Sequence, residues 1–209
     1  MIRILIADDH SLIREGLKKT LREESDMKIV GEAVSAEEVI SRIHNVDLLL
    51  LDVSLPGKSG LELLRDLKPH LKKLRVLILS MYPERLFATR ALKAGASGYI
   101  TKGAEPEELL KAIRLVARGS RYVSPAVATQ LADAVATGGD PGTGHELLSG
   151  REFEILRLIG SGEKISAIAK RLSISIQTVH TYRSRILTKL NLSTTSELVR
   201  YVVEKGLLP

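Results

Sequence analysis

A strand predicted over Leu48–Val53 begins with four consecutive leucines. A strand with one face in water alternates apolar and polar residues, so an unbroken apolar run indicates a strand that is buried on both faces. Strands of this kind belong to parallel sheets that have helices on each side. Four other short, apolar, β-branched runs are the remaining predicted strands: Ile2–Ala7, Lys28–Gly31, Val76–Ser80 and Tyr99–Ile100.

Amphipathic stretches separate these runs, and each predicts a helix: 11–23, 36–44, 59–68, 84–94 and 105–118. In the last stretch, Leu109, Ile113 and Val116 recur at the spacing of one helical face. A strand followed by a helix, five times over, is typical of an α/β fold. We therefore expect a doubly wound, five-stranded parallel sheet.

A segment over 138–144 divides the chain, because four of its seven residues are glycine and one is proline. This composition disfavours both helix and strand and predicts a flexible linker. Just before it, an alanine-rich stretch from Pro125 to Ala136 predicts a connector helix. The expected organisation is a domain over 1–122, a linker helix and flexible linker over 123–146, and a second domain over 147–209.

The C-terminal part has no strand signal, and its apolar residues recur at helical spacing. Two capping boxes of the form Ser/Thr-x-x-Glu mark the starts of its first and last helices. We expect a small all-α domain of four helices, which begin near Ser149, Ile165, Ile176 and Thr194. A tight turn over 173–175 separates the second helix from the third.

The composition excludes several classes of protein. The chain has no cysteine, which excludes disulfides, zinc ribbons, iron–sulfur clusters and thiol catalysis. Apolar runs are shorter than the roughly 18 residues that a membrane span needs. Asp8 and Asp9 also come too early for a signal peptide. The expectation is a cytoplasmic protein that makes no contact with membranes.

The net charge of +6 is unevenly distributed. Residues 145–209 carry ten Lys or Arg and six Asp or Glu, and the segment from Lys164 to Lys189 has six basic residues and no acidic one. Charge alone fits a solvated face as well as a face that binds a polyanion. A basic cluster that binds nucleic acid gains affinity by releasing the counterions condensed on the nucleic acid. The pattern of the helices has to decide between the two interpretations.

Polar residues follow four of the predicted strands, where ligands bind in open α/β sheets. They are Asp8 and Asp9 after the first strand, Asp52 after the third, Ser80 after the fourth and Lys102 after the fifth. Carboxylates that lie close together repel each other unless a cation neutralises them. Without cysteines or a histidine cluster, a hard cation such as Mg²⁺ fits the site. An aspartate placed here can attack phosphorus and form an acyl phosphate.

Four segments carry these residues: Asp8–His10, Leu51–Gly60, Leu79–Ser80 and Tyr99–Lys102. They resemble the receiver domain of bacterial two-component response regulators, which has a flavodoxin-like fold, and the resemblance covers roughly residues 1–120. It implies that Asp52 is the phosphoacceptor for a sensor histidine kinase. It also implies contacts of Ser80 and Lys102 with the phosphoryl group, and a switch formed by Ser80 and Tyr99. The implied Mg²⁺ ligands are Asp8, Asp9, Asp52 and the main-chain carbonyl of Ser54.

The second and third helices of the C-terminal part have the dimensions of a helix-turn-helix. On a helical projection, Tyr182 and Ile186 fall on the side of Val179, which is expected to pack inward. The opposite side carries the residues expected to face DNA: Gln177, His180, Thr181, Ser184, Arg185 and Thr188. Arg183 lies within the apolar arc, where its stem can cover the core while its guanidinium reaches a phosphate.

Residues 147–209 resemble the LuxR-type DNA-binding domain, through Leu148–Glu152, Ile168–Val179 and Ile186–Leu190. The whole chain thus resembles a NarL/FixJ-type response regulator. The resemblance implies base contacts by His180, Thr181 and Ser184, and phosphate contacts by Ser175, Thr178 and Lys189. Several positions depart from the frequent family residues, including His180, Tyr182, Thr194 and Thr195, so the target sequence stays open.

The expected function is that of a transcription regulator whose binding to double-stranded promoter DNA depends on phosphorylation. It is not an enzyme, beyond its part in its own phosphorylation and dephosphorylation. A homodimer is expected when it is phosphorylated or bound to DNA, and RNA polymerase is a further candidate partner. In the last helix, Val199, Val202 and Val203 are expected to be either dimer contacts or core.

Other interpretations of the sequence stay open. The helical domain can dock a protein instead of DNA, and the chain can act without phosphate. A phosphatase that uses an aspartyl-phosphate is a weaker alternative, because Ser54 stands where its second acid is required. Taken alone, Asp9 or Ser11 can be no more than a helix cap.

Overall fold

A computed structural model of the chain describes residues 1–71, 73–136 and 144–208. The chain divides into two compact units, 1–133 and 134–209, and each is described by itself. Most of the expected flexible linker lies outside the described residues. Within the described part, no helix combines the length and the apolar character that crossing a membrane requires.

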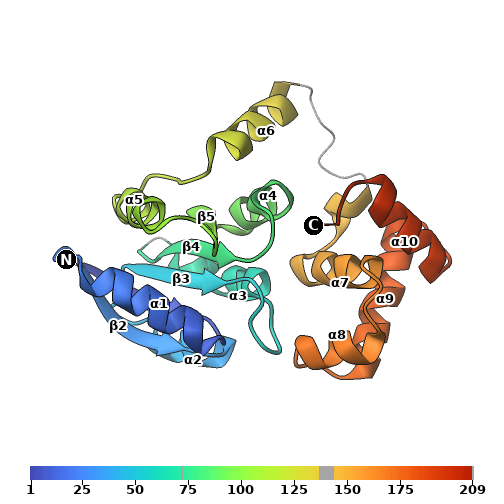
Figure 1. Cartoon of the computed structure of the whole chain (residues 1–209), viewed down its shortest axis with the longest axis horizontal. Helices are drawn as coiled ribbons and strands as arrows, with labels where there is room; N and C mark the ends of the chain where they lie inside the picture. The colour runs from blue at the N-terminus through green and yellow to red at the C-terminus, as the bar shows by residue number, and fades with distance from the viewer. Residues whose placement is uncertain (72, 137–143, 209) are drawn as a thin grey trace. The chain divides into compact units, whose positions relative to one another are not determined.

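The first unit is the predicted five-stranded parallel sheet with helices on both faces (Figure 1). The strand order is β2-β1-β3-β4-β5. Its elements, in chain order, are β1 (Ile2–Ala7), α1 (Ser11–Arg22), β2 (Met27–Ala33), α2 (Ala36–Arg42), β3 (Leu48–Asp52), α3 (Gly60–Asp66), a 3-10 turn (Lys68–His70), β4 (Arg75–Ser80), α4 (Glu84–Ala94), β5 (Gly98–Thr101), α5 (Pro106–Ala117) and α6 (Pro125–Ala136), whose last residues pass into the second unit.

The leucine run lies in the centre of the sheet, on β3, and is fully buried. Side chains alternate between the two faces of a strand, so Leu48 and Leu50 pack with residues of α1 and α5. Leu49 and Leu51 point to the opposite face, which α2, α3 and α4 cover (Figure 1). Burial on both faces explains why the run does not alternate with polar residues.

The strand register brings distant residues together at one edge of the sheet. Ala7 pairs with Leu51, so the residues that follow them, Asp8 and Asp52, are neighbours. On the other side of β3, Asp52 pairs with Leu79, the residue before Ser80. Four polar positions of the sequence therefore meet at the carboxyl ends of the strands, because Ser80 in turn pairs with Thr101, one residue before Lys102.

Local contacts set the end of α3 and the start of α1. The helix predicted over 59–68 ends at Asp66, because the chain continues into the 3-10 turn that contains Pro69. His10, rather than Asp9 or Ser11, occupies the N-cap position of α1, and its side chain makes no capping hydrogen bond. The capping interpretation of Asp9 and Ser11 is therefore wrong.

The second unit is all-α in its described part, as predicted (Figure 1). Its elements are a 3-10 turn (Gly144–Leu147), α7 (Gly150–Gly160), α8 (Ile165–Arg171), α9 (Ile176–Leu190) and α10 (Thr195–Glu204). Both predicted capping boxes form, one at the start of α7 and one at the start of α10. Ser173 adopts a positive φ of 52° in the tight turn between α8 and α9.

Gly60 is required by the loop that follows Asp52. Its N–H donates to the carbonyl of Val53 at 2.7 Å, and a Cβ at position 60 would lie 2.1 Å from the carbonyl oxygen of Asp52. Backbone atoms cannot move aside as the end of a flexible side chain can. The absence of a side chain at Gly60 therefore lets the start of α3 pack against the end of β3.

We predict that Gly60→Ala lowers the free energy of unfolding by about 1–3 kcal/mol, the usual cost of overpacking. Urea unfolding of the chain, followed by circular dichroism, measures the change. The matched control is Gly16→Ala, since no atom lies within 4 Å of a Cβ built at that helical position. The control should be neutral or stabilising by up to about 1 kcal/mol. Equal effects of the two substitutions would contradict the close approach.

Candidate functional site

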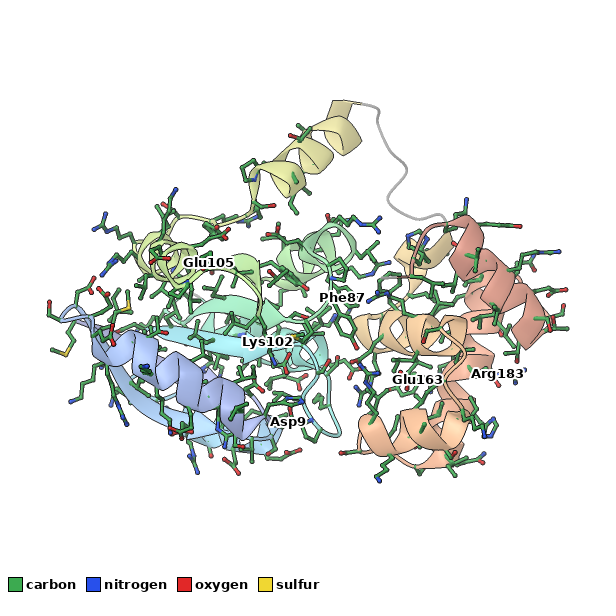
Figure 2. All side chains as sticks on the ribbon, viewed as in Figure 1. Asp9, Phe87, Lys102, Glu105, Glu163 and Arg183 are labelled. Atoms are coloured by element: carbon green, nitrogen blue, oxygen red, sulfur yellow. The ribbon has the colours of Figure 1, made fainter. Side chains whose placement is uncertain are left out.

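A buried lysine joins two buried aspartates at the carboxyl edge of the sheet. The Nζ atom of Lys102 lies 2.7 Å from Oδ2 of Asp8 and 2.7 Å from Oδ2 of Asp52. The three side chains are only 4%, 2% and 3% exposed, respectively. Because β5 ends at Thr101, the amine of Lys102 reaches back over the ends of β4 and β3 (Figure 2).

The electrostatic state of this cluster is set by burial and by the opposed charges. Burial raises the pKa of Asp52, and the attraction of Lys102 acts in the opposite direction without cancelling that effect. Burial lowers the pKa of Lys102, but Asp52 and Asp8 together outweigh it, so that this pKa is raised. Lys102 is therefore held as a fixed positive charge, while additional positive charge would favour the ionised form of Asp52.

Asp9 and His10 extend the cluster toward solvent. Ligand atoms of Asp8, Asp9, His10 and Asp52 all lie within 4.8 Å of one another, so this group could hold a metal ion. The carboxylate oxygens suit a hard divalent cation such as Mg²⁺, the ion expected from the sequence. The N–H of Ser54 donates to Oδ1 of Asp52 at 3.2 Å, which places the start of the β3–α3 loop beside the cluster.

Ser80 and Tyr99, the predicted switch residues, both contact the main chain of Tyr82. The fully buried Oγ of Ser80 accepts a hydrogen bond from the N–H of Tyr82 at 3.1 Å. The hydroxyl of Tyr99, which is also buried, donates to the carbonyl of Tyr82 at 2.9 Å. The Tyr82 ring stacks on Phe87 of α4, with centroids 4.5 Å apart. The loop between β4 and α4 thus links the cluster to α4 and β5.

Arg14 of α1 contacts the main chain of the cluster at Asp8. The sequence pattern did not indicate this contact. Its Nη1 donates to the carbonyl of Asp8 at 2.8 Å, and its Nε donates to Glu32 at 2.9 Å. An arginine on an amphipathic helix is ordinarily read as a solvated residue. Only the approach of α1 to the end of β1 identifies the contact.

The side of α9 that the sequence predicts to face DNA is exposed. Val179 and Ile186 are fully buried, which confirms the direction of the apolar face. The exposed residues of α9 include Gln177, His180, Thr181, Ser184, Arg185 and Thr188. The guanidinium of Arg185 lies over the ring of Tyr182, 5.9 Å from its centroid.

The four candidate phosphate contacts, Ser175, Thr178, Arg183 and Lys189, have partners inside the second unit. Ser175 caps α9 by accepting from the N–H of Thr178 at 3.0 Å, and the two hydroxyls lie 2.8 Å apart. Nε of Arg183 donates to Thr195 at 2.8 Å. Nζ of Lys189 lies 2.7 Å from the carboxylate of Glu152. These contacts position the helix-turn-helix, whether or not the same side chains also reach phosphates.

The three valines of α10, which were expected to be either dimer contacts or core, differ in their exposure to solvent. Val202 is fully buried and belongs to the core of the second unit, whereas Val203 is 59% exposed. Val199 is half-buried. Only Val203 and the exposed edge of Val199 are free for a dimer contact.

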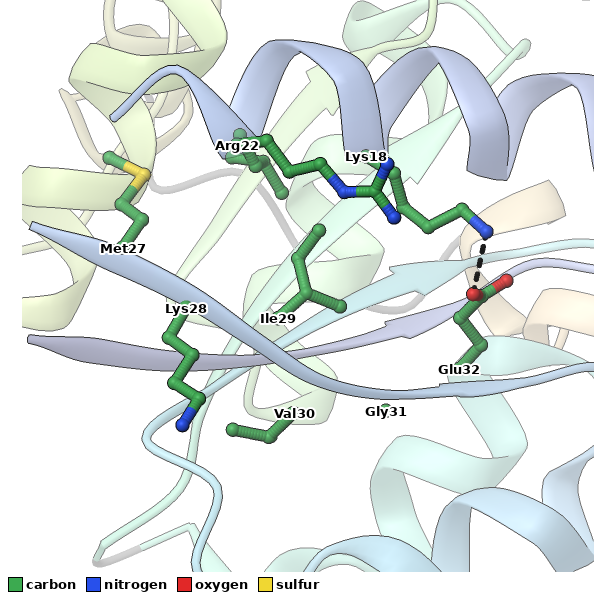
Figure 3. Close-up of a pocket in the computed structure, with 9 residues that line it drawn as sticks. Lys18, Arg22, Met27, Lys28, Ile29, Val30, Gly31 and Glu32 are labelled. Carbon is green, nitrogen blue, oxygen red and sulfur yellow. Dashed lines mark hydrogen bonds and ion pairs between the residues drawn. The ribbon is translucent and has the colours of Figure 1, made fainter. Parts of the chain in front are cut away.

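A hollow of about 510 Å³ lies away from this site, along the edge strand β2 (Figure 3). Its lining includes apolar residues of α1 and β2 and the ion pair between Lys18 and Glu32. None of the polar residues at the strand ends lines it.

Two different protein families match the chain, one in each of its two units. Residues 4–114 match the response regulator receiver domain, and residues 146–202 match the luxR family of bacterial regulatory proteins. The response regulator GacA of Pseudomonas viridiflava is 40% identical over 210 residues, which cover 100% of this chain and 98% of GacA. The response regulator UvrY of Escherichia coli (strain K12) is 35% identical over 209 residues, which cover 99% and 96%.

Solved structures are similar along the whole chain. RcsB from Salmonella enterica serovar Typhimurium, bound to promoter rprA in the presence of phosphomimetic BeF3-, has a TM-score of 0.64 and 26% identity, and the match covers 97% of this chain and 98% of RcsB. The response regulator ChrA of a heme-sensing two-component system has a TM-score of 0.54 and 30% identity, with 99% and 98% covered. The chain therefore belongs to the two-component response regulators of the NarL/FixJ type, with a receiver domain followed by a LuxR-type DNA-binding domain.

Proposed function

We propose that the chain is a phosphorylation-dependent regulator of transcription, with Asp52 as the phosphoacceptor. The observation that carries this proposal is the contact of Lys102 with both Asp8 and Asp52 at the carboxyl edge of the sheet. Taking three charged groups out of water costs several kcal/mol for each ion. Such a costly burial of charged groups is typical of functional sites, where the charges take part in binding or catalysis.

The proposed reaction is transfer of a phosphoryl group from the phosphohistidine of a sensor kinase. A carboxylate oxygen of Asp52 attacks phosphorus, the new O–P bond forms as the P–N bond breaks, and the histidine nitrogen keeps the electron pair. Asp8, Asp9, Asp52 and the main-chain carbonyl of Ser54 are the proposed Mg²⁺ ligands. The ion, when bound, neutralises charge on the carboxylates and on the transferred group. Lys102 stabilises the same developing charge.

The signal then passes through Ser80 and Tyr99. In the proposed switch, the Ser80 hydroxyl leaves the N–H of Tyr82 and donates to a phosphoryl oxygen. Because Tyr99 donates to the carbonyl of the same residue, a move of the β4–α4 loop changes the contacts of both side chains. The affected surface includes α4 and β5, and its two arrangements would differ in the dimer that they favour.

DNA is the proposed target of the second domain, which would bind promoter DNA as a homodimer. The exposed face of α9 would enter the major groove, with His180, Thr181 and Ser184 at base edges. Gln177 and Arg185 complete that face, and Ser175, Thr178, Arg183 and Lys189 are the proposed phosphate contacts. Similarity to RcsB, whose structure was determined with promoter DNA and BeF3-, supports both halves of the proposal. We also propose that RNA polymerase is a partner of the chain and that the protein is located in the cytoplasm.

Asp52→Asn should abolish acid-labile phosphate incorporation from labelled acetyl phosphate in the presence of Mg²⁺, because an amide cannot form the acyl phosphate. Labelled protein is measured after separation from the donor. Asp47→Asn is the matched control, since Asp47 lies outside the cluster and pairs with Arg3. If Asp52→Asn is still labelled, another residue accepts the phosphoryl group.

Lys102→Met should lower the free energy of unfolding by about 3 kcal/mol in the presence of EDTA, because two buried carboxylates lose their cation. Added Mg²⁺ should recover part of the loss, since an ion that binds only the folded state stabilises it. Urea unfolding measures both effects. The control is Lys111→Met on the exposed side of α5. Unchanged stability of Lys102→Met would show that the ion pairs do not form.

Lys189→Ala and Thr181→Ala should weaken DNA binding in different ways. Loss of Lys189 should weaken all duplexes alike and reduce the slope of log affinity against log salt by about one unit. Loss of Thr181 should change the order of preference among sequences and leave the slope unaltered. Fluorescence anisotropy over a salt series tests both. An unchanged slope for Lys189→Ala would mean that, in the wild-type complex with DNA, the amine of Lys189 stays on Glu152 and contacts no phosphate.

A further inference from the structure

We propose that His10 is a protein ligand of the divalent cation site, and that its imidazole raises the affinity of this site for transition-metal cations such as Mn²⁺ relative to Mg²⁺. The inference rests on the cation site of the proposed function and names a residue that has no part in it so far. The juxtaposition that carries it is the position of one ring nitrogen between two carboxylates.

His10 is held at the cluster by the main chain. It lies between the end of β1 and the start of α1, and its N–H donates to Oδ1 of Asp8 at 2.9 Å. Since the side chain makes no capping hydrogen bond, the usual role of an N-cap residue does not explain its orientation. The ring is turned instead toward the acidic residues.

The Nδ1 atom of His10 contacts two carboxylates at once. It lies 2.8 Å from Oδ1 of Asp9 and 3.2 Å from Oδ1 of Asp8. An atom of His10 is thus among the four ligand atoms that lie within 4.8 Å of one another. An ion that binds these carboxylate oxygens would stand beside Nδ1, where the imidazole can replace one of its water molecules.

The imidazole can act in either of two states. Without an ion, an N–H at Nδ1 donates to Asp9. With an ion, the neutral ring with its proton on Nε2 offers the Nδ1 lone pair. The side chain is 63% exposed, so water can bond to the other nitrogen in both states. No rearrangement of the fold is needed to pass from one state to the other.

The chemistry of the donor set predicts selectivity. Mg²⁺ prefers oxygen ligands and keeps several of its waters, so it gains little from an imidazole. Imidazole is a good ligand for later transition metals such as Fe²⁺, Ni²⁺ and Cu²⁺, and Mn²⁺ begins the series along which affinity rises to Cu²⁺. Mn²⁺ also accepts carboxylate oxygens, so it can use both kinds of donor in this site. Three carboxylates with one imidazole should therefore bind Mn²⁺ more tightly, relative to Mg²⁺, than the carboxylates alone.

The experiment uses the full chain with Mn²⁺ as the probe and ¹⁵N-labelled histidine. Pulsed electron paramagnetic resonance should detect a directly bound histidine nitrogen in the wild type and in His70→Asn, an exposed histidine of the same domain. The signal should be absent in His10→Asn, in which the new residue is a favourable N-cap and keeps the helix start. Competition titrations should show the Mn²⁺ preference over Mg²⁺ falling by about tenfold in His10→Asn, the lower end of effects seen when groups around a metal are removed.

The outcomes separate this inference from the proposed function. If Mn²⁺ binds and Asp9→Asn weakens it, but no histidine nitrogen is detected, His10 only hydrogen-bonds to the carboxylates and the inference is overturned. An unchanged ratio of Mn²⁺ to Mg²⁺ affinity in His10→Asn would overturn the selectivity. If Asp9→Asn leaves Mn²⁺ binding unaltered, the cation site of the proposed function fails as well.

Discussion

The ion pairs that Lys102 forms with Asp8 and Asp52 are the interaction on which the rest of the receiver domain depends. Each charge would be costly to bury alone, and together they are tolerable because each lies within 2.7 Å of its partner. The pairs form only if β1, β3 and β5 end at the same edge. The cluster is therefore a product of the parallel topology and of strand register, and a shift of one residue in any of these strands would separate the charges.

The same arrangement explains how a small chemical change could be reported elsewhere. Ser80 and Tyr99 are coupled, because both form a hydrogen bond with the main chain of Tyr82. A hydroxyl drawn toward a phosphoryl group would release one of these bonds and disturb the other. In the second unit, the burial of Val179 and Ile186 and the contact of Lys189 with Glu152 hold α9 with its polar face outward.

The sequence was sufficient to predict the order of strands and helices along the chain, because each carries its own periodicity. It also placed Asp8, Asp52, Ser80 and Lys102 at one edge, since the ends of parallel strands must meet. The contact of Arg14 with the main chain of Asp8 could not be predicted in this way. It depends on the approach of α1 to the end of β1, which no local pattern encodes, and the partners of Arg183 and Lys189 likewise come from other helices.

The most direct test of the account is the affinity of the full chain for duplex promoter DNA before and after treatment with a phosphodonor and Mg²⁺. The account predicts that the wild type gains affinity within the range usual for coupled sites, about 5- to 150-fold. The chain that carries asparagine in place of Asp52 should show no gain. An equal change in both proteins, or no change in the wild type, would contradict the claim that the buried carboxylates control the DNA-binding domain.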